Sequence, residues 1–106
     1  MEATQKQVAE YLGRRIRRIR RGLDMSQENL ADNAGIHRTQ LTLIENGHRL
    51  PRIDTMIKLA GGLGFAPCEL LGGIVWEVGA GRPGRLVVTG RATDVRGSAG
   101  RGGDHV

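Results

Sequence analysis

The strongest constraint in this chain is a stretch of twenty residues, SQENLADNAGIHRTQLTLIE, that runs from Ser26 to Glu45. Its first half has apolar residues at helical spacing, and Ser26 before it is a residue type that caps helix N-termini. Gly35 can take a positive φ, which ends one helix and turns the chain into the next. The stretch therefore predicts two short helices joined by a tight turn.

Small and aliphatic side chains mark the inward faces of these two helices. Alanines in the first helix allow the second to approach closely, and the second is expected to start near residue 37 or 38. Asn46-Gly47 is a turn signal, so the second helix should end at Glu45. The inward positions are Leu30, Ala31, Ala34, Ile36, Leu41 and Ile44.

A longer helix is predicted upstream, over residues 6–21, with Gly22 suited to cap its C-terminus. Apolar residues recur there at spacings of three and four, which indicates one buried stripe rather than a membrane-surface helix. The other positions hold arginines, and for all of them except Arg20 a solvated face and contact with a partner both stay open. The stripe is Val8, Leu12, Ile16, Ile19 and Leu23; the arginines are Arg14, Arg15, Arg17, Arg18, Arg20 and Arg21.

Two more helices are predicted downstream, so the fold class is all-α with five helices in a compact bundle. One covers about residues 53–62, capped by Asp54 or the preceding loop. The other covers about residues 67–71, because Pro67 suits a first helical turn. The apolar side of the first of these helices is Met56, Ile57, Ala60 and Leu63.

The composition changes near Gly72, which divides the chain into a helical domain (1–73) and two further segments. Residues 74–89 contain two β-prone runs around a turn-rich middle, so they predict a short β-hairpin. A lone hairpin is marginal in water and must pack on the helices or on another chain, with Trp76 as its anchor. Residues 90–106 hold too little apolar surface to order themselves and predict a disordered tail.

Charge and composition narrow the class of partner. The 106 residues suit one domain, and 16 Lys and Arg against 11 Asp and Glu leave a formal charge of +5. That balance suits a polyanion, although many basic domains are merely soluble. A single cysteine, Cys68, forms no internal disulfide and no metal-binding cluster, and the three histidines are scattered. We expect no metal and no cofactor.

The sequence supports neither an enzyme nor a membrane protein. It has no phosphate-binding glycine loop, no nucleophile motif and no clustered carboxylate–His set. No apolar run approaches the roughly 20 residues of a membrane span, and no signal peptide is visible, so a cytoplasmic location is expected. Only about 30 residues lie outside the bundle, so we expect no small-molecule ligand.

The segment from about residue 12 to 71 resembles the Cro/C1-type helix-turn-helix family, also called the Xre family, of phage repressors and bacterial regulators. The residues that carry the resemblance are Ile16-Arg17, Arg20, residues 23–31, Gly35-Ile36, residues 41–47, Pro51, Met56, Leu59-Ala60 and Leu63-Gly64. The resemblance covers a little over half the chain and implies a lambda-repressor-like bundle. Proteins use a helix-turn-helix to lay its second helix in the DNA major groove.

The resemblance also implies DNA-contact roles for individual residues. Base reading falls to the exposed front of the second helix of the motif, where an arginine can donate twice to guanine. His37 stands where the family often has a serine, and it is a weaker cap. The base-reading candidates are His37, Arg38, Thr39, Thr42 and Leu43; the phosphate-binding candidates are Gln27, Gln40, Asn46, His48 and Arg49.

Arg20 and Glu45 match a buried ion pair of the family and are expected to be structural. The predicted function is a sequence-specific DNA-binding transcriptional regulator, a repressor, that acts as a homodimer on an inverted repeat of double-stranded DNA. The hairpin with Trp76 is the candidate for dimer formation or for closing the core. The alternative is an antitoxin, or a DNA-binding subunit that docks another protein such as a toxin.

Overall fold

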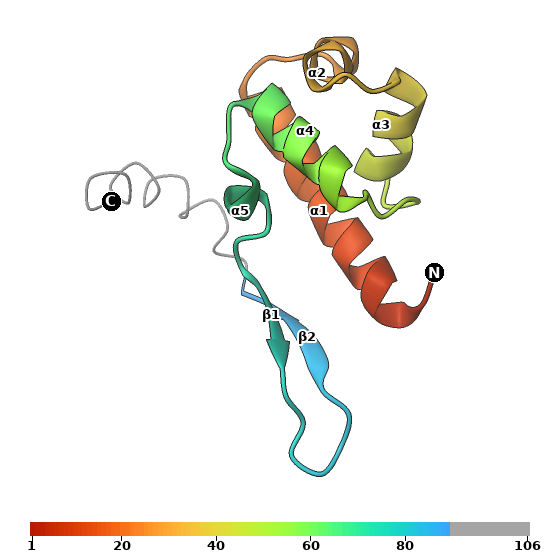
Figure 1. The fold of residues 1–106 in the computed structure, drawn as a ribbon, viewed down its shortest axis with the longest axis vertical. Coiled ribbons are helices and arrows are strands. Elements are labelled where there is room, and N and C mark those ends of the chain that lie inside the picture. The colour runs from red at the N-terminus through yellow and green to blue at the C-terminus, as the bar shows by residue number, and fades with distance from the viewer. Residues whose placement is uncertain (90–106) are drawn as a thin grey trace, which may run out of the picture.

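The computed structural model describes residues 1–89, and the predicted disordered tail, 90–106, lies outside the described residues. Figure 1 shows the helices gathered at one end and a β-hairpin projecting from them. This arrangement confirms the predicted bundle and hairpin. The elements are α1 (Ala3–Gly22), α2 (Gln27–Ala34), α3 (Arg38–Glu45), α4 (Ile53–Leu63), α5 (Pro67–Leu70), β1 (Ile74–Glu77) and β2 (Arg85–Val88).

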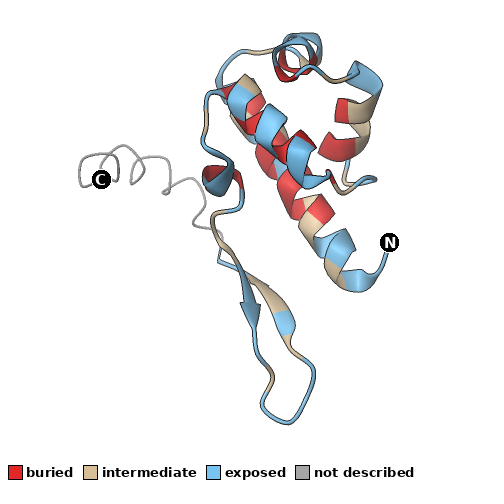
Figure 2. Ribbon diagram, viewed as in Figure 1, coloured by how far each residue is buried: buried red, intermediate tan, exposed pale blue. Residues whose placement is uncertain are grey.

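One aliphatic core lies between the helices, on the faces coloured as buried in Figure 2. Helix α2 packs on α4, and α3 packs on both α1 and α2. Every helix contributes a side chain to the core, which keeps the short α2 and α3 in place although helices of eight residues are marginal alone. The fully buried aliphatic members are Leu12, Ile16, Leu30, Leu41, Ile44, Leu59 and Leu70.

Most of the predicted helix boundaries are confirmed. The Ser26 side chain accepts from the amide of Asn29 and caps α2, and Gly35 ends it with φ +70°. Gly47 turns the chain after α3 with φ +76°. Helix α1 starts earlier than predicted, at Ala3, because the Glu2 side chain forms a capping box with Gln5.

Four expectations for individual side chains and caps are wrong. Gly22 is the last residue of α1 rather than its cap, and Asp24 takes the positive φ of +56° instead. Leu23 follows the helix, off its stripe, and is 49% exposed. Ile57 is 53% exposed because α4 turns Met56 and Leu59 inward. Arg15 is buried, at 2% exposed, so α1 does not carry all its arginines on a solvated face.

Helix α1 is joined to α5 and to the loop after α5 by two long-range hydrogen bonds. The Tyr11 hydroxyl donates to the carbonyl of Gly72 at 2.9 Å, and Arg15 Nη2 donates to the carbonyl of Glu69 at 2.8 Å. Burial lowers the pKa of Arg15, and the neighbouring Tyr11 partly opposes that effect. An arginine stays charged in any case, so its buried cation fastens α5 to α1.

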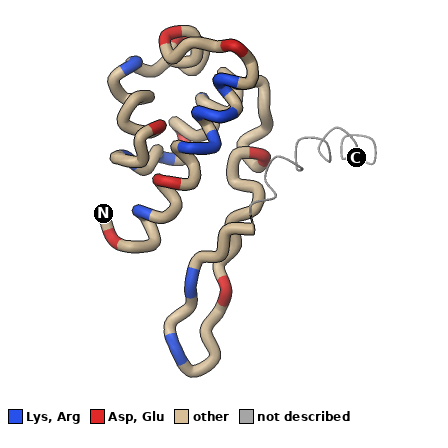
Figure 3. The backbone as a smooth tube through the Cα atoms, turned by 180° about the vertical axis from the view of Figure 1, so that it is seen from behind, with Lys and Arg blue, Asp and Glu red and all other residues tan. Residues whose placement is uncertain are grey.

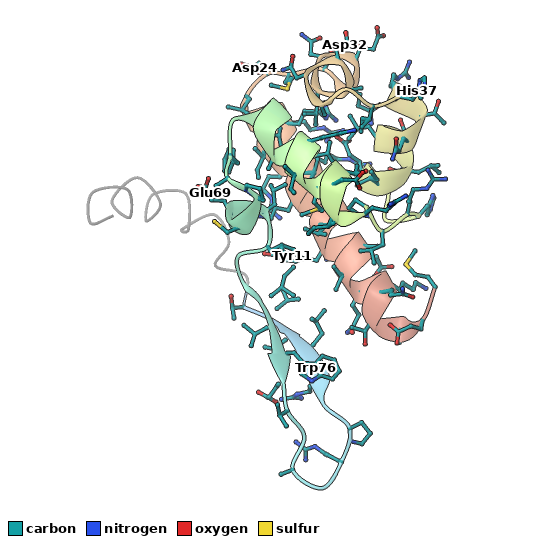
Figure 4. The ribbon with its side chains drawn as sticks, viewed as in Figure 1. Tyr11, Asp24, Asp32, His37, Glu69 and Trp76 are labelled. Atoms are coloured by element: carbon teal, nitrogen blue, oxygen red, sulfur yellow. The ribbon has the colours of Figure 1, made fainter. Side chains whose placement is uncertain are left out.

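The hairpin joins the bundle at its base and is exposed at its tip. Strands β1 and β2 are antiparallel, and Ile74, opposite Val88, packs against the core. The amide of Thr89 donates to the carbonyl of Gly73 at 2.8 Å. Trp76 lies on the projecting part (Figure 4), and its ring is so close to Gly84 that no Cβ fits between them. The tryptophan therefore packs within the hairpin and stays 53% exposed.

Helices α1 and α3 approach each other closely at Gly13 of α1. A Cβ built there would lie 2.4 Å from the carbonyl oxygen of Ile44 and 2.7 Å from that of Glu45. The absence of a side chain therefore lets α1 lie directly against the C-terminal turn of α3. By contrast, a Cβ at Gly22 would meet no atom within 4 Å.

We predict opposite effects for Gly13→Ala and Gly22→Ala. The first must push α1 away from α3 and should lower the free energy of unfolding by about 1–3 kcal/mol, the usual cost of overpacking. The second has room and should leave stability unchanged or raise it by up to about 1 kcal/mol through helix propensity. Urea denaturation followed by circular dichroism measures both. Equal stability of the two variants would contradict the close approach of α1 to α3.

Candidate nucleic-acid interface

The front of α3 presents four of the predicted base-reading side chains together. Arg38, Thr39, Thr42 and Leu43 line one shallow hollow of about 360 Å³. Arg38 and Thr39 are exposed, whereas Thr42 and Leu43 are half-buried. The spacings of one, three and four residues place them on adjoining rows of one helix face. This surface offers a guanidinium, two hydroxyls and a leucine side chain within one helix length.

The other predicted contacts lie around this front. His37 is exposed at the outer end of α3 (Figure 4), and its side chain makes no capping hydrogen bond. Gln40 is half-buried on α3. Asn46, His48 and Arg49 are exposed in the loop that follows α3. The structure thus gathers the predicted contacts at α3 and its two ends.

Gln27 is held by the side chains of α3 rather than pointing freely away. Its Nε2 donates to Glu45 Oε1 at 3.0 Å, and its Oε1 accepts from the Thr42 hydroxyl at 3.3 Å. The same hydroxyl also contacts the carbonyl of Arg38 at 3.0 Å. A primary amide carries a second N–H on Nε2, which leaves Gln27 one further bond to donate at the N-terminus of α2.

The ion pair expected between Arg20 and Glu45 is present beneath this surface. Arg20 donates from Nε to Glu45 Oε2 at 2.7 Å and from Nη2 to Oε1 at 3.0 Å, which is the two-bond fork geometry. The Glu45 side chain is fully buried and that of Arg20 is 9% exposed. Arg20 Nη1 also donates to the carbonyl of Met25 at 2.8 Å. One guanidinium therefore joins α1, the loop before α2, and the end of α3.

The environment of Glu45 favours its charged form. Burial by itself would raise the pKa of this carboxyl, but hydrogen bonds from Arg20 and Gln27 and the positive charges of Arg20 and Arg17 outweigh it. The pKa of Glu45 is therefore held below its ordinary value of 4.5. The carboxylate stays ionised at neutral pH and keeps its two donors in position.

Two more arginines of α1, for which the sequence left a solvated face and contact with a partner open, lie at this surface. Arg17 Nη2 donates to Asn46 Oδ1, and Arg17 Nε lies 3.6 Å from Glu45 Oε1. Arg17 and Arg21 also line a hollow of about 500 Å³ at the N-terminus of α2. We call it the α2 hollow; its lining is Arg17, Arg20, Arg21, Ser26, Gln27, Glu28 and Arg38. The sequence signal for Arg17 was its match to the family next to Ile16, whereas Arg21 was one of the arginines left open between a solvated face and contact with a partner.

The chemistry of this surface is that of an anion receptor. Guanidinium groups surround the N-terminus of α2, where the first backbone N–H groups have no partner within the helix and the helix dipole is positive. Figure 3 shows basic positions following one another along the C-terminal part of α1 beside it. Among residues 1–89, no three His, Cys, Asp or Glu side chains are grouped so that they could hold a metal ion.

Within the same described part of the chain, no helix combines the length and the apolar character that crossing a membrane requires.

Comparison with known proteins gives one consistent family. The model of the helix-turn-helix family HTH_3 matches residues 16–70. The control protein C.BamHI of Bacillus amyloliquefaciens is 40% identical over 60 residues, which are 56% of this chain and 74% of that protein. The restriction-modification controller protein C.AhdI of Aeromonas hydrophila has 34% identity and a TM-score of 0.57, over 58% of this chain and 94% of C.AhdI.

A second solved controller protein has a similar fold. The wild-type restriction-modification controller protein C.Esp1396I superimposes with a TM-score of 0.57 at 25% identity, over 60% of this chain and 83% of that one. The family match, residues 16–70, contains the α2–turn–α3 motif. The residues of the interface described above lie within or next to the family match.

We predict that Glu45→Gln strongly destabilises the fold. The amide has no charge, so the nearly buried Arg20 loses its counter-ion, at a cost of about 3–5 kcal/mol in the free energy of unfolding. The matched control is Glu77→Gln, which breaks the exposed pair of Glu77 with Arg85 at 2.8 Å. That pair should be worth no more than about 1 kcal/mol. Similar decreases in the free energy of unfolding of the two variants would show that burial of the Arg20–Glu45 pair adds nothing to its effect on stability.

The same pair should make stability fall in acid. Because the pKa of Glu45 is lower in the folded state, its contribution is complete above pH 4.5 and is lost as the pH falls through the folded pKa. Below pH 4.5 the wild type should therefore lose stability more steeply than Glu45→Gln. Denaturation series at several pH values measure the two slopes, and parallel slopes would contradict the assignment.

Proposed function

The chain belongs to the Cro/C1-type helix-turn-helix family of DNA-binding transcriptional regulators, and from that premise we propose that it is a repressor that inserts α3 into the DNA major groove. The observation that carries this proposal is the exposed front of α3, where Arg38, Thr39, Thr42 and Leu43 lie together. A helix of this width fits the major groove. The proposed action is occupancy of a promoter, with no chemical step.

In this proposal, the side chains of α3 read bases. Arg38 has the fork that donates to O6 and N7 of guanine, while the methyl of Thr39 or Thr42 and the side chain of Leu43 can meet a thymine methyl. His37, at the start of the helix, reads a base at the edge of the site. The half-buried position of Thr42, bonded to Gln27, limits it to a contact through its methyl group.

The second part of the proposal concerns phosphates on either side of α3. Gln27 at the N-terminus of α2 donates its second amide N–H to one strand, assisted by the helix dipole. Asn46, His48 and Arg49 in the loop after α3 contact the other, and Gln40 adds a bond from α3. These contacts set the orientation of α3 but carry no sequence information.

We further propose that the regulator works as a homodimer on an inverted repeat. One module reads few base pairs, whereas two modules about 34 Å apart, one turn of DNA, combine their affinities. The hairpin supplies the surface: it projects from the bundle (Figure 1), and Val75, Trp76, Val78 and Val88 are all exposed on it. A two-stranded hairpin of this kind gains stability when a second copy covers it.

The relatives suggest which genes are regulated. C.BamHI is named as a control protein, and C.AhdI and C.Esp1396I are named as restriction-modification controllers. We therefore propose the promoter of a restriction-modification gene set as the target. The alternative, an antitoxin or a subunit that docks another protein such as a toxin, stays a prediction. Co-purification of this chain with a toxin would support that alternative.

Selection of bound sites from a random DNA pool tests the proposed function, and Arg38→Ala then tests base reading. This variant should lose about 1–3 kcal/mol of binding free energy on the selected site and relax the preference at one base pair. Gln27→Ala should weaken binding to selected and random DNA alike. A melting curve for each variant controls for folding, since Gln27 also bonds Glu45. Equal losses from Arg38→Ala on selected and random DNA would contradict base reading.

We predict a dimer by sedimentation at micromolar concentration, strengthened by DNA. Val75→Lys should shift the equilibrium toward monomer, because it places a charge on the hairpin at a residue that is 52% exposed. Ile57→Lys is the matched control, with similar exposure on α4. A dimer that is lost with Ile57→Lys and kept with Val75→Lys would place the interface on α4. Monomer alone, with or without DNA, would contradict the dimer.

A further inference from the structure

We propose that four arginines on the surface of α1 form a second phosphate-binding track, which follows the DNA backbone beyond the segment that α3 contacts. The residues are Arg14, Arg17, Arg18 and Arg21, which line a hollow of about 310 Å³ on the surface of α1. We call this the α1 hollow. The inference rests on the proposed function, because it extends the DNA footprint from the helix-turn-helix onto α1.

Geometry connects the track to the proposed DNA surface. Arg17 and Arg21 line both the α1 hollow and the α2 hollow, so the two are continuous across one pair of guanidiniums. The α2 hollow also contains Gln27, the proposed phosphate contact, and Arg38 at the start of α3. A backbone strand seated at the N-terminus of α2 would therefore meet Arg14 and Arg18 next.

Charge on this face is concentrated and almost entirely positive. The four arginines are spaced three or four residues apart, so each has a like-charged neighbour on the helix surface, an unfavourable arrangement in the absence of an anion. Of the residues that line the two hollows, Glu28 is the acidic one. The nearby carboxylate of Glu45 is buried under Arg20 and Gln27. A bound polyanion would relieve this repulsion.

The choice of residue type favours phosphate groups. Every position in the α1 hollow is arginine, although Lys6 and Lys58 show that the chain also uses lysine. The planar guanidinium matches two phosphate oxygens at once, whereas lysine is a point charge. The row is also straight, since it follows one helix, and this suits a regular series of phosphates rather than one compact anion.

The experiment compares Arg14→Ala/Arg18→Ala with a control that removes the same charge elsewhere, Lys58→Ala/Arg82→Ala. Arg14 and Arg18 are exposed, as are Lys58 and Arg82 in the control. Fluorescence anisotropy with a labelled random-sequence duplex gives the dissociation constant over a series of salt concentrations. The logarithm of the association constant decreases linearly with the logarithm of the salt concentration. The steepness of this decrease is reduced by roughly 0.9 for each phosphate that the protein no longer neutralises.

We expect the slope of the α1 variant to be smaller by about two, with tenfold or greater weakening at low salt, and that of the control to be nearly unchanged. The melting temperature of the α1 variant at low salt should equal or exceed that of the wild type, because repulsion is removed. A merely structural role for the two arginines would lower it.

Other outcomes overturn the inference separately from the proposed function. If the wild type binds DNA but the α1 variant has the slope and affinity of the control, the track is wrong and the helix-turn-helix surface stands. If affinity falls on a selected site but not on random DNA, the arginines read bases and do not follow the backbone. If the wild type binds neither the selected site nor the random-sequence duplex, the proposed function fails as well.

Discussion

The structure depends on one buried ion pair, that between Arg20 of α1 and Glu45 at the end of α3. Burying two charges is costly, so the pair stabilises the fold only while its geometry and its extra hydrogen bonds are complete. They are complete here: both carboxylate oxygens are used, Gln27 adds a donor, and Arg20 also bonds the carbonyl of Met25. The value of such a pair lies in position more than in energy. It joins the end of α3 to α1 and to the loop before α2.

Helix α3 needs that support because its own sequence provides little. It has eight residues, too few for a stable isolated helix, and His37 gives it no side-chain cap. Its position comes from Leu41 and Ile44 in the core, from Gly13, which lets α1 lie against its last turn, and from the bond between Thr42 and Gln27. Arg38 and Thr39 on its outer face are exposed and take no part in the core.

Helix α1 illustrates how one arginine-rich segment can serve two purposes. Arg15 and Arg20 turn inward and bond backbone carbonyls of α5 and of the loop before α2. Arg14, Arg18 and Arg21 turn outward, and Arg17 lies between the two sets, bonded to Asn46. The inward arginines hold the elements that surround α3, while the outward ones give the surface its charge. The helical period alone separates the two roles, because arginine is long enough to reach a carbonyl across the core or to extend into solvent.

The sequence by itself determined the features whose cause is local. Ser26, Gly35 and Asn46-Gly47 mark the ends of α2 and α3, since a cap or a positive φ is a property of a few adjacent residues. The resemblance to a known family added the pairing of Arg20 with Glu45. Tertiary structure alone decided which arginines of α1 are buried, that Leu23 and Ile57 stay exposed, and that Trp76 packs within the hairpin rather than on the helices. These outcomes depend on where distant elements lie, and no spacing within one segment encodes the position of a carbonyl fifty residues away.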